Sequence, residues 1–471
     1  MNPAVLLAVR GDVHDVTIDG VTASMLARTG STIAAPLVDT PEGRAFERLR
    51  QGPTTADTLD AIAAVDGANG LARWLLWSGR AVRRGLLVYR VVDSDGATLA
   101  EFVPVRGDAP DLARALPSST TATARLQLSR FAILHRRDGM LVLESPLAAV
   151  RAELSSRAVA LVTTFGEART LDDIAAGQAD LEAVRTLVAV LATTGILVAV
   201  GGDGRPDEDR DPVLSQWEPH DLLLHTRTRT SQVDEPRGGT FRFADQRPAP
   251  PALRHPVGAP ALTLPRPDLD RLMAEDLPFA RVMEERESRR RLGMLNAAQL
   301  GEFLYRTVRV RRQITAGDDP EAYPRTDRPH AAAGGMHELI TYLAITDCDG
   351  IPAGLYRYDP VGHGLDLVAA PSPAVDRLLE DARGAAAAEC PPPVLVILAA
   401  DFARLSWKYE GIAYALTLKD VGVVLSTMQL VATAMGLGSC PLGAGDSEAF
   451  SIAARLRPLE ETSVGELMLG S

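Results

Sequence analysis

The pattern of hydrophobic and polar positions predicts several short strands and helices in the first 200 residues. Pairs of apolar runs meet at Asp95-Gly96 and again at Asp138-Gly139, and helical patterns lie around both pairs. An Asp-Gly step between two apolar runs predicts a tight β-hairpin. Small helices closed by a two-stranded wing are typical of winged-helix modules. We therefore predict two such modules in tandem, residues 1–106 and residues 107–201.

Residues 202–268 are rich in proline, glycine and charge, which predicts a linker. Within it, the segment "SQWEPHDLLLHTRTRT" has a helical pattern, and we expect it to dock on a neighbouring domain. Its residues Trp217, His220 and His225 are a possible metal or catalytic cluster. Two histidines five positions apart do not share a helix face well, so packing is the favoured interpretation.

Residues 269–471 change to long helices and short strands, which predicts an α+β domain of about 200 residues. A helix from about Ile412 to Met435 is apolar on nearly every side, so we expect it to be buried in a core or between subunits. The loop "GLGSCPLGAGD" follows this helix. A dinucleotide-binding fingerprint needs a strand before the glycines, so a Rossmann fold is excluded.

Composition narrows the classes of partner and compartment. The formal net charge is −12 and the isoelectric point is about 5.3, which argues against a nucleic-acid partner and an anionic membrane surface. The first apolar run breaks at Arg10 and the longest uncharged run, from Thr186, contains a turn signal, so we expect neither a signal peptide nor a membrane span. Cys348, Cys390 and Cys440 are far apart and odd in number, which predicts neither a disulfide framework nor a metal site and fits a reducing cytoplasm.

Lysine usage gives the first chemical signal. Only Lys408 and Lys419 occur among 49 basic side chains, so arginine fills almost every other cationic position. Arginine stays protonated, whereas a desolvated lysine can release its proton and act as a general base. The ordinary alternative is a surface lysine whose stem covers apolar neighbours. Lys408 stands between Trp407 and Tyr409, which favours the chemical interpretation.

Two other stretches are candidate ligand contacts. Arg286, Ser288 and Arg290 alternate at a spacing that can place two guanidinium groups and a hydroxyl around a phosphate, although a charge run is more often a solvated helix face. The small residues 331–335 allow a flat ligand to approach the backbone closely. The alternative is a simple helix start.

Together these segments resemble the FMN-dependent nitroreductase superfamily, and within it the SagB-type (ThcOx-like) azoline dehydrogenases. The resemblance rests on "RESRR", "GLYRYDPVGHGL", "KYEGIAYALTLKDVG", "LVATAMGLGSCPLGAGDSEAF" and "ETSVGELMLGS". It covers residues 269–471 closely, and "WEPHDLLLHTRTR" and "PRGGTFRF" are similar to the segment that precedes the catalytic domain in this family. The N-terminal modules are more loosely similar to peptide-clamp or leader-peptide recognition domains.

The resemblance implies an obligate homodimer that binds FMN at the subunit interface. It also implies oxidation of thiazolines or oxazolines in a ribosomal precursor peptide to thiazoles or oxazoles, during antibiotic biosynthesis. A cyclodehydratase of the same pathway is an expected partner, and the cytoplasm is the expected location. The family motifs give Lys408 and Tyr409 as catalytic residues. They predict these cofactor-binding residues: Arg286, Ser288, Arg290, Ala331, Ala332, Ala333, Gly334, Ser426, Gly436, Gly438, Leu442 and Gly443.

This chain departs from the family pattern at two places. Ala331-Ala332 replaces the usual Pro-Ser pair of the flavin loop, which removes one side-chain contact to the flavin ring. Ser426-Thr427 replaces the Gln-Thr pair that relatives often carry in the long helix. Neither change touches Lys408 or Tyr409, but weaker flavin contacts keep a non-catalytic role open.

Aromatising an azoline removes a hydride and a proton from adjacent ring carbons. FMN is the expected hydride acceptor, Lys408 the expected base and Tyr409 its partner, with an exchange of these two roles left open. Two alternatives remain: an NAD(P)H-dependent nitro or quinone reductase, and a non-catalytic scaffold that binds the precursor peptide. A simple reductase has no need of the long N-terminal region, which favours the dehydrogenase.

Overall fold

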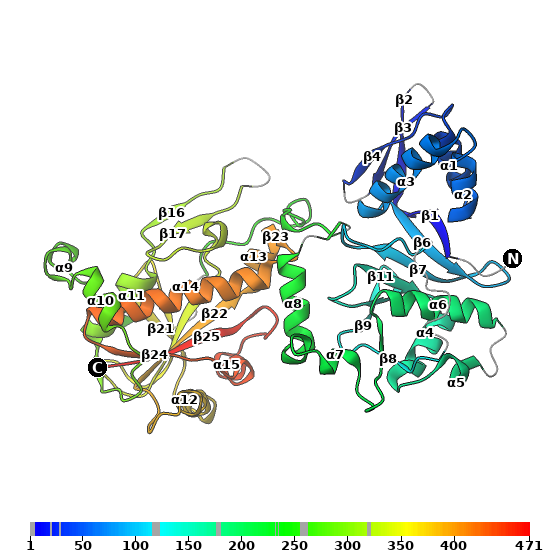
Figure 1. Cartoon of the computed structure of the whole chain (residues 1–471). Helices are drawn as coiled ribbons and strands as arrows, with labels where there is room; N and C mark the ends of the chain where they lie inside the picture. Colours follow the sequence, from blue (N-terminus) through cyan, green and yellow to red (C-terminus); the bar gives the residue numbers. More distant parts are fainter. Residues whose placement is uncertain are drawn as a thin grey trace. The chain divides into compact units, whose positions relative to one another are not determined.

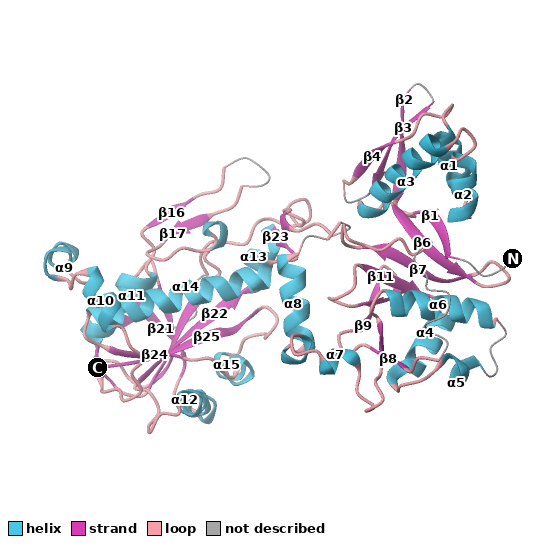
Figure 2. Ribbon diagram, in the orientation of Figure 1, coloured by secondary structure: helices cyan, strands magenta, loops and turns pink. Residues whose placement is uncertain are grey.

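The chain folds as two compact units, Met1–Pro236 and Arg237–Ser471 (Figure 1). The computed structural model describes residues 5–18, 21–27, 30–114, 123–175, 180–230, 232–233, 235–254, 262–317 and 322–471. Both units contain helices and strands, with several strands in succession along the chain, which confirms the predicted α+β class (Figure 2). The winged-helix assignment and the division at residues 106, 201 and 268 stay predictions.

An antiparallel seven-stranded sheet organises the N-terminal unit, in the order β5-β1-β6-β7-β11-β10-β9. Its strands are β1 (Val5–Val9), β5 (Thr54–Thr55), β6 (Leu87–Val92), β7 (Thr98–Pro104), β9 (Ile133–Arg137), β10 (Met140–Glu144) and β11 (Val150–Leu154). Both predicted hairpins are confirmed, because Gly96 and Gly139 adopt positive φ in the turns of β6–β7 and β9–β10. The sheet therefore includes strands from both predicted modules.

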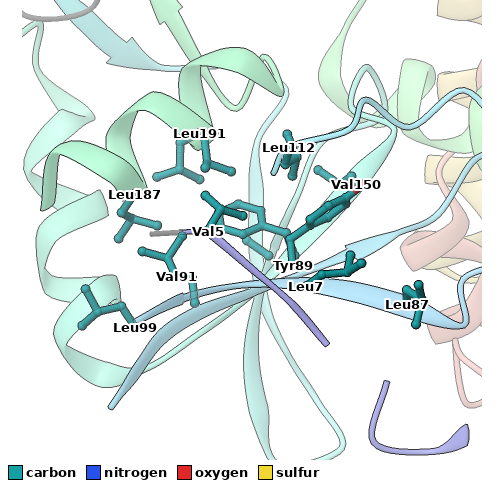
Figure 3. Packing of buried hydrophobic residues seen from close by; sticks show 14 of the residues in the cluster. Val5, Leu7, Leu87, Tyr89, Val91, Leu99, Leu112, Val150, Leu187 and Leu191 are labelled. Atoms are coloured by element: carbon teal, nitrogen blue, oxygen red, sulfur yellow. The ribbon is translucent and has the colours of Figure 1, made fainter. Parts of the chain in front are cut away.

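The helices of this unit bury their apolar faces in one hydrophobic cluster with the sheet. Leu187 and Leu191 of α6 pack among strand residues that include Val5, Tyr89 and Val91 (Figure 3). The helices are α1 (Pro41–Arg50), α2 (Ala56–Ala63), α3 (Ala68–Arg83), α4 (Ser156–Thr163), α5 (Leu171–Ala175) and α6 (Leu181–Thr193). The smaller strands are β2 (Val13–Ile18), β3 (Val21–Ala27), β4 (Thr32–Ala34), β8 (Leu126–Leu128) and β12 (Leu197–Ala199).

The start of the predicted linker is more ordered than its composition indicates. It contains α7 (Asp207–Arg210) and α8 (Pro219–Arg229). Glu208 is buried, and it accepts hydrogen bonds of 2.6 Å from the Ser129 hydroxyl and from the Arg130 backbone N–H. Arg227 of α8 forms an ion pair with Glu144 of β10. These polar contacts hold a segment that has few apolar residues to bury.

A second antiparallel seven-stranded sheet organises the C-terminal unit, in the order β14-β21-β20-β18-β22-β25-β24. Its strands are β14 (Leu262–Thr263), β18 (Leu339–Ile345), β20 (Gly354–Asp359), β21 (Gly364–Ala369), β22 (Val394–Asp401), β24 (Gly438–Pro441) and β25 (Glu461–Gly470). The central strand β22 is buried along its whole length. Its near-continuous apolar sequence follows from having both faces covered.

Helices cover both faces of this sheet. One face packs on α11 (Ala297–Val308) and α14 (Ala413–Ala434), and the other on α12 (Pro373–Ala386) and α15 (Ser447–Ala454) (Figure 1). Three short helices complete the unit: α9 (Leu269–Glu275), α10 (Phe279–Glu285) and α13 (Phe402–Lys408). The remaining short strands are β13 (Gly238–Gly239), β15 (Leu295–Asn296), β16 (Arg312–Ile314), β17 (Arg325–Asp327), β19 (Cys348–Asp349) and β23 (Tyr409–Glu410).

The long apolar helix α14 is only partly buried within this chain. Val424, Met428 and Ala432 lie in the core, whereas Leu418 is 40% exposed and Val423 is 39% exposed. By length and composition alone α14 passes as a membrane span, which is weak evidence because a core helix of a soluble protein passes the same test. The exposed apolar side chains of α14 indicate a surface that another molecule can cover.

Candidate active site

Lys408 and Tyr409 lie at the junction of a short helix and a short strand. The carboxylate of Asp401, at the end of β22, caps α13 by accepting a 3.2 Å hydrogen bond from Ala403 N–H. Lys408 is the last residue of this helix, and Tyr409 begins β23, which pairs with β13. The backbone N–H of Phe241 donates to Lys408 O at 3.1 Å. The preceding segment of the C-terminal unit thus fixes the backbone of the Lys-Tyr pair.

Aromatic rings surround the half-buried Lys408 side chain. Its Nζ lies 4.7 Å from the ring centre of Tyr323, 5.1 Å from that of Tyr409 and 5.4 Å from that of Phe241. Ring faces attract the ammonium group, and they remove part of its hydration. Nζ also forms a 2.6 Å hydrogen bond with the Tyr323 hydroxyl. The lysine is therefore held by specific partners, unlike a surface lysine that only covers apolar neighbours.

The small-residue stretch meets the Lys-Tyr pair at Gly334. This residue has φ of +59°, a left-handed conformation that glycine adopts without steric cost. A Cβ atom placed on it would lie 2.7 Å from Tyr409 Oη, 3.1 Å from Lys408 Nζ and 3.2 Å from Tyr323 Oη. Three polar atoms thus converge on a position that only a residue without a side chain leaves open.

A pair of acidic residues lies beneath the same stretch. Asp420 of α14 accepts a 2.8 Å hydrogen bond from Ala333 N–H. Glu338 is fully buried, and among the described residues no donor reaches either of its carboxyl oxygens. Burial, and then the negative charge of Asp420, raise the pKa of Glu338. A protonated Glu338 that donates to Asp420 leaves neither group charged and unpaired, so it is the favoured arrangement.

Two arginines and two histidines are buried near this acidic pair. Arg404 is 3% exposed and donates a 2.8 Å hydrogen bond from Nε to Met336 O. Burial lowers the pKa of Arg328 to about 10, of His330 to about 4 and of His337 to about 3. Both histidines are therefore neutral at pH 7. Arg328, His337, Glu338 and Arg404 help to line a cavity of about 260 Å³.

The predicted phosphate-binding residues lie on an exposed segment between α10 and β15. Arg286, Ser288 and Arg290 are all exposed. Residues 286–294 are not helical, so the segment does not form the solvated helix that a charge run usually makes. Arg290 donates from Nε to Ala386 O at 2.8 Å, and Gln429 of α14 lies 3.5 Å from the Ser288 hydroxyl. Among the described residues no acceptor binds the two terminal nitrogens of Arg290, which leaves them for a ligand.

The other predicted cofactor residues follow α14 or lie on it. Ser426 is exposed on α14, and Gly436 has φ of +68° directly after this helix. Gly438 lies in β24, beside the backbone of the phosphate segment, because Arg289 N–H donates to Ser439 O at 2.9 Å. Leu442 N–H donates to Glu466 O, and the exposed Gly443 follows. The cofactor role of these residues stays a prediction.

Metal binding gains no support in the part of the chain that the structure describes. It contains no group of three or more histidine, cysteine, aspartate or glutamate side chains placed to hold a metal ion. His220 is 81% exposed, while the rings of Trp217 and His225 lie 5.4 Å apart. Packing is therefore the better interpretation of this aromatic segment.

Sequence reasoning did not identify Tyr323, Glu338 or Asp420. Tyr323 lies 85 positions before Lys408, and only the fold brings the two together. For Asp420, the signal was an acidic residue in an otherwise apolar helix. Glu338 stands just before a buried strand, where a carboxyl group needs a specific reason.

Two protein families match this chain. Residues 126–234 match the family described as cyanobactin oxidase ThcOx, and residues 321–470 match the nitroreductase family. The second match includes Gly334, Lys408 and Tyr409. The C-terminal unit therefore contains a nitroreductase-family domain, which the match places at residues 321–470. The resemblance inferred from the sequence is confirmed at the level of these two families.

Individual relatives of the nitroreductase domain are distant. A protein of Methanocaldococcus jannaschii named as a nitroreductase is 26% identical over 121 residues, which is 24% of this chain and 56% of that protein. The chain thus spans little more than half the length of this relative.

Solved structures give weaker likenesses. A nitroreductase of Ralstonia eutropha is 22% identical, with a TM-score of 0.35, over 48% of this chain and 96% of that one. The Escherichia coli microcin synthetase McbBCD complex with truncated pro-MccB17 bound is 15% identical, with a TM-score of 0.32, over 55% and 96%. TM-scores this low carry no argument about activity.

Proposed function

We propose that the protein is an FMN-dependent dehydrogenase that oxidises azoline rings of a ribosomal precursor peptide to azoles. One observation carries this proposal: Lys408 Nζ and Tyr409 Oη converge at Gly334, within the loop that the family uses for flavin. A proton acceptor beside a hydride acceptor is the pair of groups that aromatisation of such a ring requires.

The residues present fit an FMN group. Arg286, Ser288 and Arg290 supply two cations and a hydroxyl on an exposed segment, a donor set suited to a phosphate. Residues 331–335 offer backbone without bulky side chains next to Lys408, which suits a flat ring system. FMN, when bound, supplies the hydride acceptor. The two departures at Ala331-Ala332 and Ser426-Thr427 remove side-chain contacts but leave these features intact.

Lys408 acts on the substrate as the base in this proposal. A neutral amine at Nζ takes a proton from one ring carbon of the azoline and becomes an ammonium group. The nearby ring faces and the Tyr323 oxygen stabilise the positive charge that forms there. Tyr409 Oη lies 2.7 Å from the position that a Cβ on Gly334 would take, and it is placed to share the proton or to orient the ring.

The N-terminal unit is proposed to bind the precursor peptide. Residues 126–234 match the cyanobactin oxidase family, whose name denotes oxidation of a peptide product. A cyclodehydratase that acts with the protein in one biosynthetic complex is a proposed partner, because the resemblance to the azoline dehydrogenases implies one. Such a complex works on newly made peptide, so we place the protein in the cytoplasm.

A homodimer is part of the proposal because of α14. In a single chain, Tyr414, Leu418 and Val423 expose apolar surface along one helix. A contiguous exposed apolar surface marks an interaction site in a soluble protein. A second copy of the chain, packed on this helix, accounts for it.

The test is incubation of the purified protein with an azoline-containing peptide, followed by mass spectrometry. We expect a yellow protein with an FMN spectrum and a loss of about two hydrogens per ring, the stoichiometry of hydride and proton removal. Flavin-containing protein that leaves azolines intact in the presence of oxygen contradicts the proposal. Protein that retains no flavin favours the scaffold alternative.

An NAD(P)H-dependent nitro or quinone reductase remains the second candidate. The match of residues 321–470 to the nitroreductase family favours it, as does the name of the archaeal relative. Consumption of NADH with a nitroarene, without azoline oxidation, identifies this alternative.

A further inference from the structure

Tyr323 connects the lysine to the glycine loop through a hydrogen bond whose direction is fixed. Its hydroxyl donates to Gly334 O at 2.9 Å, and Lys408 Nζ lies 2.6 Å from the same oxygen. A phenol has one proton, and a carbonyl oxygen can only accept. With that proton committed to Gly334, the Tyr323 oxygen accepts a hydrogen bond from Lys408.

This direction constrains the lysine amine. A neutral amine has two N–H bonds and one lone pair, and the hydrogen bond to Tyr323 uses one N–H. The nearby ring faces of Phe241 and Tyr409 attract the positive ends of N–H bonds and not a lone pair. The remaining direction is the opening at Gly334, where a Cβ would lie 3.1 Å from Nζ. The lone pair is therefore aimed at the space where a substrate proton has to be.

We propose that Tyr323 is a positioning residue of this site, which orients the Lys408 amine so that its lone pair faces the substrate. The inference rests on the proposed function for its chemical meaning. The hydrogen bond persists when Nζ takes up the proton, because the ammonium form also donates to the Tyr323 oxygen. Tyr323 thus holds the base in one position in both of its protonation states.

Packing keeps the Tyr323 ring in place independently of its hydroxyl. The ring centre lies 6.2 Å from that of Trp407 and 6.3 Å from that of Phe241. The guanidinium of Arg325 lies 5.7 Å from the ring centre. Phenylalanine preserves these contacts, so Tyr323→Phe removes only the oxygen that accepts from Lys408 and donates to Gly334.

The chain offers a matched control for this change. Tyr305 packs its ring on His363 and Arg309, and among the described residues its hydroxyl forms no hydrogen bond. Tyr305→Phe is therefore the same chemical change in the same unit, at a phenol without a polar partner.

The first measurement is turnover of an azoline peptide by full-length protein across pH 6 to 10. For Tyr323→Phe we expect kcat to fall by about ten-fold or more, as for a lost hydrogen bond to a charged group, with KM and bound flavin unchanged. The pH of half-maximal kcat is expected to move down, because the protonated amine loses its acceptor. Wild-type kcat and pH profile in Tyr323→Phe, when Lys408→Arg is inactive, overturn the inference and leave the proposed function standing.

The second measurement does not need turnover. Because the chain contains only two lysines, acetylation by acetic anhydride can be followed at Lys408 with Lys419 as an internal reference. We expect Tyr323→Phe to change the ratio of the two labelling rates by about three-fold or more, and Tyr305→Phe to leave it unchanged. An unchanged ratio in Tyr323→Phe overturns the inference. If the wild-type protein oxidises no azoline, a changed ratio still supports the positioning role, so the two proposals fail separately.

Discussion

The two units each contain a seven-stranded sheet, but they differ in how deeply their charged side chains are buried. In the N-terminal unit, charged groups mostly form ion pairs that keep contact with solvent, such as Arg90 with Glu101 and Arg157 with Asp93. In the C-terminal unit, Glu338, His337 and Arg328 are buried, and burial displaces the pKa of each. The N-terminal unit also contains buried charged residues, among them Glu208 and Arg151, and burial lowers the pKa of Arg151.

The difference indicates where the chemistry resides. Solvated ion pairs contribute little to stability and leave the ordinary protonation states in place. Buried groups with displaced pKa values cost stability, and they cluster at functional sites. The C-terminal unit is therefore expected to lose activity when its polar groups change, whereas changes in the N-terminal ion pairs should affect stability slightly.

The largest effect is expected at Lys408. Lys408→Arg keeps the positive charge and most of the volume but removes the ability to accept a proton. Turnover of an azoline peptide should fall by about a hundred-fold to ten-thousand-fold, with bound FMN retained. Lys419→Arg, at the exposed second lysine, is the control. A fall of less than roughly ten-fold means that only the charge matters, and it transfers the role of base to Tyr409.

A smaller loss is expected at the phosphate segment. The double variant Arg286→Ala and Arg290→Ala removes two charge-assisted contacts, so FMN retention should weaken by about ten-fold or more. Flavin absorbance after gel filtration measures the effect. Arg291→Ala is the control, because Arg291 is exposed and pairs with Glu389 at 2.9 Å. Full flavin content in the double variant contradicts the phosphate assignment.

Sequence patterns predicted the parts of this site that local chemistry defines. The Asp-Gly turns, the Lys-Tyr pair and the small-residue stretch could be identified because each depends on adjacent residues. Tyr323 could not, since its role arises only when the segment before β17 meets the end of α13. Glu338 could not be identified either, because Asp420, whose charge raises the pKa of Glu338, lies on a distant helix. The order in residues 207–216 was missed because it rests on buried polar contacts such as those of Glu208, which composition does not reveal. The helical pattern of residues 215–230 correctly predicted α8.

The exposed apolar side chains of α14 test whether this difference extends to assembly. Leu418→Glu combined with Val423→Glu places two charges on exposed parts of this helix, where they oppose association of two copies. Light scattering should show a dimer for the wild-type protein and a monomer for the variant. Leu459→Glu is the control, because Leu459 is 92% exposed in the turn before β25 and is not part of α14. A wild-type monomer contradicts the homodimer.

Glu338 gives a pH-dependent effect on stability. Its ordinary pKa is 4.5, and burial raises it to about 8 in the folded chain. Between these values the folded state holds a proton that the unfolded state lacks, so the free energy of unfolding falls as pH rises through this range and then levels off. Glu338→Gln keeps a neutral donor to Asp420 and removes the proton, so it should flatten this dependence.

Thermal unfolding of both proteins from pH 5 to pH 9 measures the difference. Burial also raises the pKa values of Asp401, Glu461 and Glu466, but these groups are the same in both proteins and cancel in the comparison. The expected gap at pH 8 is on the order of a few kcal/mol in favour of the variant. Parallel curves for the two proteins rule out a proton held by Glu338.

The smallest effect is expected at an ion pair of the N-terminal unit. Arg157 is 43% exposed and pairs with Asp93 at 3.1 Å. Asp93 also accepts hydrogen bonds from the N–H groups of Asp95 and Ala97, at 3.1 Å and 2.8 Å, in the β6–β7 turn. Arg157→Ala therefore leaves Asp93 with partners, and it should lower the free energy of unfolding by less than about 1 kcal/mol.

Asp93→Ala leaves two backbone donors of the turn without their acceptor, and it should lower the free energy of unfolding by about 1–3 kcal/mol. Urea unfolding measures both, and azoline turnover should change in neither by more than the lost folded fraction. If Arg157→Ala costs as much as Asp93→Ala, the ion pairs of this unit matter more than their exposure indicates, and the difference between the two units lies elsewhere.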